Sequence, residues 1–490
     1  MTISFNSVPS NLRIPFVAVE FDTSRAQQGP ALLAYKGLII GQKLAGGTAT
    51  ADTVVKVSNL DQVITYAGRG SLLHRQYLAW TAVNKSTEVW LGVLADNGAG
   101  VAAQGTITVT GPATAAGTIA LYLGGVRIAV GVNNGDAQNT VATAIGAAIN
   151  AALDLPITAA VATNVVTWTF RHKGTAGQGF DVRHSFNFGE SLPAGITLSI
   201  AATTAGITNP SLTNLIAAMT DMWFQIWTHP YTDTASLAAI EAELVSRWGP
   251  LRATGGQAFT SAIGSFSTLS ALGVARNSPY SSIVAQPFVT PLTPSYEFAA
   301  ETAALVAYYG QIDPARPFQT LAMVNAISGL ETDQFDTTER NLLLFTGIAT
   351  TRRAAGGVIQ LERMITTYET SPSGASDTAY LDVTTMLTLL YLRYSFRTRM
   401  LLKYPRHKLA NDGTRFGSGQ AIITPKGGKA EAITWFREME ELGLVENFDQ
   451  FKRDLVVVRN DTDPNRLDFL LPPDIINGLV VVAAQVQFRL

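Results

Sequence analysis

The last twelve residues of the sequence alternate between two kinds of side chain with a period of two. The odd positions from Gln485 on are polar, and the even positions are apolar throughout: Val480, Val482, Ala484, Val486, Phe488 and Leu490. This period is typical of a β-strand with one buried face. Because chain ends usually fray unless something holds them, the pattern predicts a C-terminal strand that joins a sheet.

A similar pattern lies near the N-terminus. Val17, Val19 and Phe21 alternate with Ala18, Glu20 and Asp22, after a proline-punctuated stretch that carries Ile3 and Phe5. We therefore predict strand-forming arms at 1–25 and 476–490, with hinges at Ser24–Pro30 and Pro472–Gly478. On the residues alone, pairing of the C-terminal strand within its own subunit is the favoured reading, and pairing with a neighbour is the alternative.

Between the arms, the pattern predicts an α/β fold, α+β when the whole chain is counted. In 26–100, ALLAYKGLIIG, TVVKV and EVWLGVL are strand-like and 72–83 is helical. The alternation of strands and helices resumes in 210–475, with predicted strands WFQIWTH, QAFTSAI and YSSIVAQ and with a helix that Asp233 caps. This alternation favours a mostly parallel sheet to which EVWLGVL and WFQIWTH both belong.

The segment 101–209 differs in character from what surrounds it. Charged residues are sparse, short strand-like runs are separated by Gly, Asn and Pro, and one helix is expected at 140–153. We interpret it as an inserted β-rich domain. Further on, GVIQLERMITTYET is predicted as one long strand, 382–404 and 428–442 as helices, and DLVVVRN and RLDFLL as strands.

Composition narrows the class of protein. Charged residues make up 15% of the 490 positions, below the share of about 25% that soluble domains average. Two explanations stay open: burial of surface in an oligomer, or a large Ala/Thr/Gly-rich β core. The net charge of −2 gives no electrostatic footprint for nucleic acid. The absence of cysteine excludes disulfides and thiolate metal sites. No signal peptide or membrane-spanning run is recognisable, so assembly in the cytoplasm is expected.

The sequence offers little catalytic chemistry. The five histidines show no HExxH spacing, and no serine has the flanking glycines of a nucleophile elbow. Gly427-Gly428-Lys429 resembles the end of a phosphate loop, but Ile423 replaces its first glycine and Ala430 its Ser/Thr. We predict no catalytic, cofactor-binding or metal-binding residues and no enzyme. A phosphate-binding α/β enzyme remains the alternative from a different class, and a surface-array or capsid-like protein is a third reading.

One charged cluster stands out on the helix predicted at 382–404 and in the loop that follows. Its members are all basic: Arg393, Arg397, Arg399, Lys403, Arg406 and Lys408. A solvated helix face, favoured near the C-terminal end by the helix dipole, is one explanation. A basic surface for an acidic protein partner is the other.

Longer stretches of sequence carry a family resemblance. They include ISFNSVPSNLRIPFVAVEFDTSRA, HPYTDTASLAAIEAELVSRWGP, ERNLLLFTGIAT, KYPRHKLANDGTRFGSGQAIITPK and DPNRLDFLLPPDIINGLVVVAAQVQFRL. In these the chain resembles contractile tail sheath proteins of the Mu-like bacteriophage type. The resemblance implies a structural protein of the virion tail. It forms helical stacked rings, expected to be hexameric, around a tail tube protein, and it contracts to drive the tube through the cell envelope.

The resemblance also assigns roles to parts of the chain. It implies that the arms add strands to neighbouring subunits, which reverses the preference for pairing within one subunit. It implies that a C-terminal helical region faces the tube, for which we favour 393–408 over 428–442, and that the insertion lies outward. Baseplate and tail terminator proteins are the further partners, without nucleic acid binding or membrane insertion. The runner-up is the sheath of a related contractile injection particle or prophage remnant.

Overall fold

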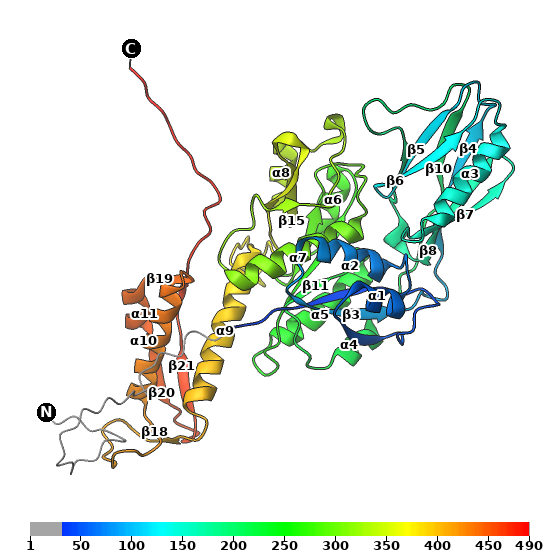
Figure 1. The fold of residues 1–490 in the computed structure, drawn as a ribbon. Helices are drawn as coiled ribbons and strands as arrows, with labels where there is room; N and C mark the ends of the chain where they lie inside the picture. Colours follow the sequence, from blue (N-terminus) through cyan, green and yellow to red (C-terminus); the bar gives the residue numbers. More distant parts are fainter. Residues whose placement is uncertain (1–31, 490) are drawn as a thin grey trace, which may run out of the picture.

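The computed structural model describes residues 32–489 (Figure 1). The predicted N-terminal arm residues Ile3, Phe5, Val17, Val19 and Phe21, together with Leu490, lie outside the described residues. The description below therefore concerns the sheets, the helices and most of the C-terminal segment.

A nine-stranded sheet in the order β14-β16-β15-β13-β12-β11-β1-β3-β2 forms the centre of the molecule. Its strands are β1 Lys36–Gln42, β2 Thr53–Val57, β3 Glu88–Leu94, β11 Ile226–Thr228, β12 Gln257–Ala262, β13 Ser281–Ala285, β14 Ala322–Met323, β15 Ile348–Arg353 and β16 Ile359–Arg363. The neighbours from β15 to β3 are parallel, whereas β2, β16 and β14 add antiparallel edges. The predicted mostly parallel sheet is confirmed, and β3 and β11 flank β1 in it although the insertion separates them in sequence.

Both faces of this sheet are covered, which is why its strands read as apolar runs in the sequence. Ile39 of β1 packs with α2 (Leu72–Val83) and α7 (Ser295–Ile312) on one face. Its neighbour Leu38 packs with α4 (Thr213–Met219) and α5 (Thr234–Trp248) on the other. The remaining helices of this part are α1 Leu60–Ala67, α6 Phe266–Val274 and α8 Thr337–Leu344, with short 3-10 turns at Glu331–Asp333 and Ala355–Gly357. Asp233 caps α5 as predicted, accepting from the Ser236 amide at 3.0 Å.

Residues 102–204 form two further sheets at one end of the molecule (Figure 1). The elements are β4 Ala102–Thr110, β5 Gly117–Leu123, β6 Val126–Val132, α3 Gln138–Ala151, β7 Ile157–Ala162, β8 Val165–Lys173, a 3-10 turn Thr175–Gly177, β9 Val182–His184 and β10 Thr197–Thr204. One sheet has the order β10-β4-β8-β7 and the other β6-β5-β9. The two chain crossings lie together, because Val101 bridges Ile207. This arrangement is consistent with an insertion, and the boundaries 101–209 stay a prediction.

The insertion is docked closely on the sheet domain. Its apolar core includes Leu72 of α2 and Tyr296 of α7. The Leu72 amide donates to His172 Nε2 at 3.1 Å, and His172 Nδ1 lies 3.0 Å from Asp96 Oδ1. Arg69 and Asp154 add an ion pair of 2.6 Å at the same junction. The two parts therefore share buried apolar and polar contacts and not merely two chain crossings.

The C-terminal part is a smaller helical unit with its own core. It contains α9 Val383–Lys403, β17 Lys408–Leu409, β18 Ile422–Ile423, α10 Pro425–Glu441, β19 Val445–Glu446, α11 Phe448–Asp454, β20 Val456–Arg459, β21 Leu467–Leu470 and β22 Asp474–Ile475. Both predicted helices and the strands in DLVVVRN and RLDFLL are confirmed. Among residues 32–489, no helix is both long and apolar enough to cross a membrane.

The long strand predicted over GVIQLERMITTYET is wrong. The strand β16 ends at Arg363, and the buried residues that follow bond to the loop before α9 and to the first residue of β13. The Thr366 amide donates to the Leu381 carbonyl oxygen, and the Thr367 amide donates to that of Ser281. Residues 364–368 are all buried between the sheet and the start of α9, and a single bridge between Ile365 and Asp382 takes the place of a β ladder.

Candidate assembly surfaces

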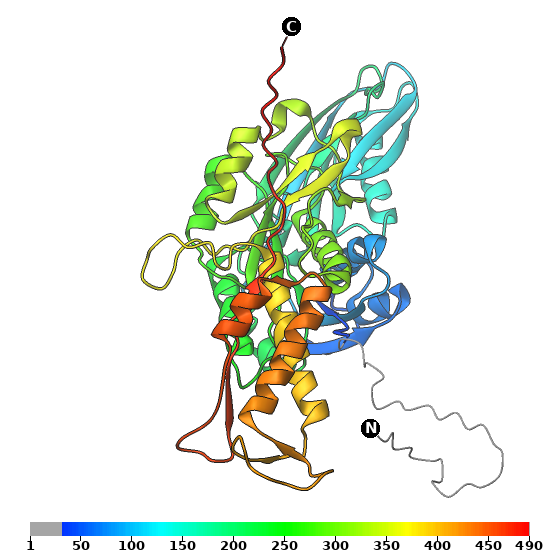
Figure 2. The ribbon, with the colours of Figure 1, turned by 90° about the vertical axis from the view of Figure 1, so that its left-hand side faces the viewer.

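The C-terminal segment 479–489 has no secondary structure; it runs away from the body in Figure 1 and passes in front of it in the view of Figure 2. Its apolar side chains are exposed, from 41% for Val480 to 85% for Val486, with Val482 and Phe488 between these values. The structure therefore does not show the strand pairing within its own subunit. Three consecutive exposed valines at 480–482, followed by alternating apolar and polar side chains from Gln485 on, form an extended segment that still needs a partner.

The root of this segment, predicted as a hinge, is held at several points. Asp474 and Ile475 form β22, which pairs with β19, and the Ile476 amide donates to the Leu444 carbonyl oxygen at 3.2 Å. Gly478 lies so close to Pro317 that a side chain at 478 would collide with its ring. Gln319 Nε2 donates to the Leu479 carbonyl oxygen at 3.1 Å. The free arm therefore begins at Val480.

An open sheet edge lies in the C-terminal unit. β20 and β21 form a two-stranded antiparallel sheet, in which Val457 and Phe469 face the core beside α10. The opposite face is half-exposed and apolar, with Val456, Val458 and Leu470 at 46%, 48% and 62%. A two-stranded sheet is at most marginally stable alone, so its outer edges are suited to strand addition.

Three of the predicted tube-facing residues contact groups of their own subunit, although the side chain of Lys403 is still half exposed. Arg399 pairs with Glu431 and Glu438 on α10, and Lys403 Nζ lies 2.8 Å from Glu431 Oε1. Burial opposes ionisation of Glu431, but hydrogen bonds from Lys403 and Arg399 hold its pKa below the ordinary value. Arg393 packs on Trp248 at the end of α5. These cations join structural elements to one another.

The other three candidates face solvent. Arg397, Arg406 and Lys408 are exposed, and Lys408 Nζ donates to Gln420 Oε1 at 2.8 Å in the same loop. Leu401 and Leu402 lie between them in sequence with 61% and 66% of their surfaces exposed. The end of α9 thus presents apolar and basic side chains together, which is a composition suited to a protein partner.

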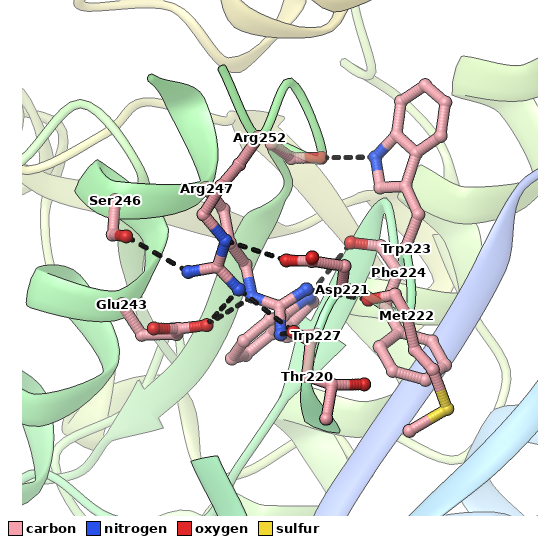
Figure 3. A network of polar contacts seen from close by, with 11 residues as sticks. Thr220, Asp221, Met222, Trp223, Phe224, Trp227, Glu243, Ser246, Arg247 and Arg252 are labelled. Atoms are coloured by element: carbon pink, nitrogen blue, oxygen red, sulfur yellow. Dashed lines mark hydrogen bonds and ion pairs between the residues drawn. The ribbon is translucent and has the colours of Figure 1, made fainter. Parts of the chain in front are cut away.

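A polar network that the sequence analysis missed fixes the chain as it returns from the insertion (Figure 3). The buried Arg247 donates to the carbonyl oxygens of Met222 and Thr220 at 2.6 and 2.7 Å, and its Nε donates to Glu243 Oε1 at 2.6 Å. Arg252 also reaches Glu243, at 3.0 Å. The four-residue spacing of Glu243 and Arg247 on a helix could have indicated their pairing. Their carbonyl partners depend on tertiary packing.

The phosphate-loop resemblance finds no support in the geometry. Thr424 caps α10 by accepting a hydrogen bond from the Gly427 amide at 3.2 Å, and the Lys426 amide donates a hydrogen bond to Asp412 Oδ1 at 2.9 Å. Lys429 Nζ donates to the Leu455 carbonyl oxygen at 2.9 Å. A carboxylate at this helix start repels a phosphate, and the lysine points to a carbonyl group. In 32–489 no group of three metal-ligating side chains is found.

Comparison with known proteins identifies the class. The family described as phage tail sheath protein central domain matches 205–367, and the one described as phage tail sheath C-terminal domain matches 375–489. The chain therefore belongs to the phage tail sheath family, in its Mu-like branch. A relative from Haemophilus influenzae, the Mu-like prophage FluMu tail sheath protein, is 39% identical over 490 residues and covers all of both chains. The chain is a structural sheath protein of a contractile tail and not an enzyme.

Two solved structures of sheath proteins align with most of the chain. A sheath tail protein from Desulfitobacterium hafniense aligns with a TM-score of 0.49 at 13% identity, over 94% of this chain and 100% of that one. The sheath complex of an extracellular contractile injection system in its contracted state gives 0.47 at 10% identity, over 98% of each chain. The family assignment rests on the sequence matches and not on these distant structural likenesses.

Proposed function

We propose that this sheath protein polymerises by strand exchange, with its terminal arms added to sheets of neighbouring subunits. The observation that carries the proposal is the exposed C-terminal segment. Val482, Val486 and Phe488 are 76% to 85% exposed in the subunit, yet their even positions are those of the buried face of a strand. Addition of such a strand to an open edge would bury this face and supply main-chain hydrogen bonds. The predicted N-terminal arm would act in the same way.

The sheet β20–β21 is the acceptor that the geometry favours. Its outer edges are open, and its apolar face with Val456, Val458 and Leu470 is exposed. A strand added beside it would extend a sheet already anchored on α10. Each subunit would thus give arms to neighbours and receive arms on its C-terminal unit.

The surface proposed to face the tail tube is the exposed end of α9 with the loop after it. Arg397, Arg406 and Lys408 supply positive charge, and Leu401 and Leu402 supply apolar contact. The insertion lies at the opposite end of the molecule from this unit (Figure 1), which supports an outward position for it.

The wider assembly follows from these roles. Subunits would form stacked hexameric rings around the tail tube, bounded by a baseplate and a tail terminator protein. Assembly would take place in the host cytoplasm before release with the virion tail, and contraction would drive the tube through the cell envelope during genome delivery. A sheath of a related injection particle or a prophage remnant would use the same surfaces.

Electron microscopy of the purified chain tests strand exchange. The full-length protein is expected to form hollow striated tubes, alone or on added tail tube. A variant that lacks 480–490 should keep the circular dichroism spectrum and thermal transition of the folded subunit but remain monomeric. Replacement of those residues by a Gly/Ser sequence of equal length is the matched control for chain length, and should fail likewise. Normal tubes from the truncated protein would refute the proposal.

A further inference from the structure

A cleft lies beside the root of the C-terminal arm. It has a volume of about 670 Å³ and is built from three distant segments: the approach to β14 at 317–319, the start of α9 at 378–385, and the arm root at 473–480. Phe345, just after α8, also lines it. The cleft therefore lies where the sheet domain, α9 and the arm meet.

An apolar rim extends from this cleft over the sheet domain. Phe345 is 72% exposed, and Leu342, one helical turn earlier, is 44% exposed. Val274 at the end of α6 is 71% exposed, and it adjoins them because Gly273 packs against the carbonyl group of Thr346. Single exposed apolar residues need no explanation, but three that lie near one another beside a cleft indicate an interface.

The charged groups of the cleft are bonded within the subunit. Arg363 pairs with Asp382 at 3.1 Å, Glu362 pairs with Arg340 at 3.0 Å, and Asp474 accepts a hydrogen bond from Asn447 Nδ2 at 2.5 Å. A broad lining of mixed polar and apolar side chains, whose charges already have partners, is typical of a protein–protein interface. This argues for a macromolecular occupant.

The arm determines which macromolecule that is. Its root is fixed by Gln319, Pro317 and β19, so the arm leaves the body beside the cleft in a set position. The ten residues 480–489 can span at most about 33–36 Å when fully extended. Any copy that takes up this strand must therefore lie close to the cleft and its rim.

We infer that the cleft and the rim of Val274, Leu342 and Phe345 are covered by a second copy of this chain, the same copy that accepts the C-terminal strand. This inference rests on the proposed strand exchange. The contact would have two parts, a flexible strand and a rigid body surface next to its origin. The strand supplies reach, and the cleft fixes the orientation of the neighbour.

Site-specific photocrosslinking in assembled sheath tests this inference. Subunits with p-benzoylphenylalanine at 345, at 488 or at both positions would be mixed in trace amounts with unlabelled subunits and assembled. Irradiation should join position 345 to a second copy, and the doubly labelled subunit should yield dimers, because both positions contact one neighbour. Phe188, a fully exposed residue of the insertion, is the control position and should yield few products.

The outcomes separate the inference from the function on which it rests. Crosslinks from 488 without any from 345 would overturn the inference and leave strand exchange intact. Trimers from the doubly labelled subunit, or products of 345 with a different protein, would also overturn it. Absence of crosslinks from both positions would count against strand exchange itself.

A substitution gives a second readout. Phe345→Glu places a charge at an exposed position, so the subunit should fold with an unchanged thermal transition. It should also raise the concentration needed for assembly about tenfold, as loss of a central interface aromatic does. Phe188→Glu is the matched control and should assemble normally. Normal assembly of Phe345→Glu would contradict the inference.

Discussion

The guanidinium group of Arg393 lies 4.3 Å from the centroid of the Trp248 ring, and its Nη1 donates to the Trp248 carbonyl oxygen at 2.7 Å. The two residues are separated by 145 positions in sequence. Their contact fastens α9 to the end of α5, and it removes one cation from the surface that the sequence assigned to the tube. Arg397, one turn later on the same helix, is exposed.

Arg393→Ala should therefore destabilise the subunit. It loses a cation–π contact and a charge-assisted hydrogen bond in a half-buried setting, together about 1–3 kcal/mol. Arg397→Ala, the matched control on the exposed side, should change the free energy of unfolding by less than about 0.5 kcal/mol. Urea unfolding of both variants measures the difference. Equal losses would show that the Trp248 contact contributes nothing specific.

Charge reversal at the exposed basic residues should weaken binding to the tail tube. The triple variant Arg397→Glu, Arg406→Glu and Lys408→Glu is expected to keep its thermal transition and to lower the sheath-to-tube ratio in purified particles. The effect should grow at low ionic strength, where screening is weak. The matched comparison is Arg393→Glu with Arg399→Glu and Lys403→Glu, which should unfold at lower temperature because it breaks internal pairs. An unchanged ratio in the first variant would exclude this surface.

The buried carboxyl group of Glu301 on α7 should make stability depend on pH. Burial raises its pKa to about 7, although the amides of Val324 and Asn325 donate to it. Since the folded state holds this proton more tightly than the unfolded state, folding is penalised as pH rises from about 4.5 to 7 and fully above that. The penalty is about 3 kcal/mol. Stability should therefore fall with rising pH in this range.

Glu301→Gln tests this dependence. The amide keeps an acceptor for Val324 and Asn325 and cannot ionise, so the variant should be more stable than the wild type at pH 8 by up to about 3 kcal/mol. The difference should vanish near pH 4.5. Glu441→Gln, at an exposed position of α10, is the control and should show no such trend. A wild type that is the more stable protein at pH 8 would mean that the ionised form is favoured.

Removal of the insertion should leave a folded but weakened subunit. Val101 and Ile207 bridge each other, so a short Gly/Ser linker can close the gap. Leu72 and Tyr296, which now lie in the core of the insertion, would become exposed, at a cost of about 3–6 kcal/mol. Thermal unfolding measures the loss, and electron microscopy should still show polymers. Unchanged stability would show that the docking contacts are not stabilising.

The parallel sheet and the long helix α9 could be predicted because their signals are local. Strands buried on both faces read as apolar runs, as in Leu38–Ile40, and α9 is bounded by Asp382 at one end and Tyr404 at the other. The segment after Arg363 misled the prediction, because residues 364–368 remain buried after the strand pairing of β16 has ended. Periodicity reports burial and does not report the hydrogen-bond partner.

The assembly surfaces were only partly predictable. Six basic residues could be located from sequence, but which of them pair within the subunit depends on α10 and on Trp248 at the end of α5. Glu431 and Glu438 neutralise Arg399, and Glu431 also neutralises Lys403, only because the two helices pack together. The cleft could not be foreseen, because Gln319, Phe345 and Val480 come together only in the folded chain.

One helix belongs to two hydrophobic cores. Val383 and Leu387 of α9 lie in the core of the sheet domain, whereas Leu392 lies in the core of the C-terminal unit. A continuous helix anchored in both cores holds the two units in a fixed orientation. Rotation of one unit against the other would break backbone hydrogen bonds of the helix or expose its packed side chains. The subunit should therefore pass through contraction as a single solid piece. The free energy that drives the tube would then be stored in the contacts between subunits, and hardly at all in the fold of each subunit.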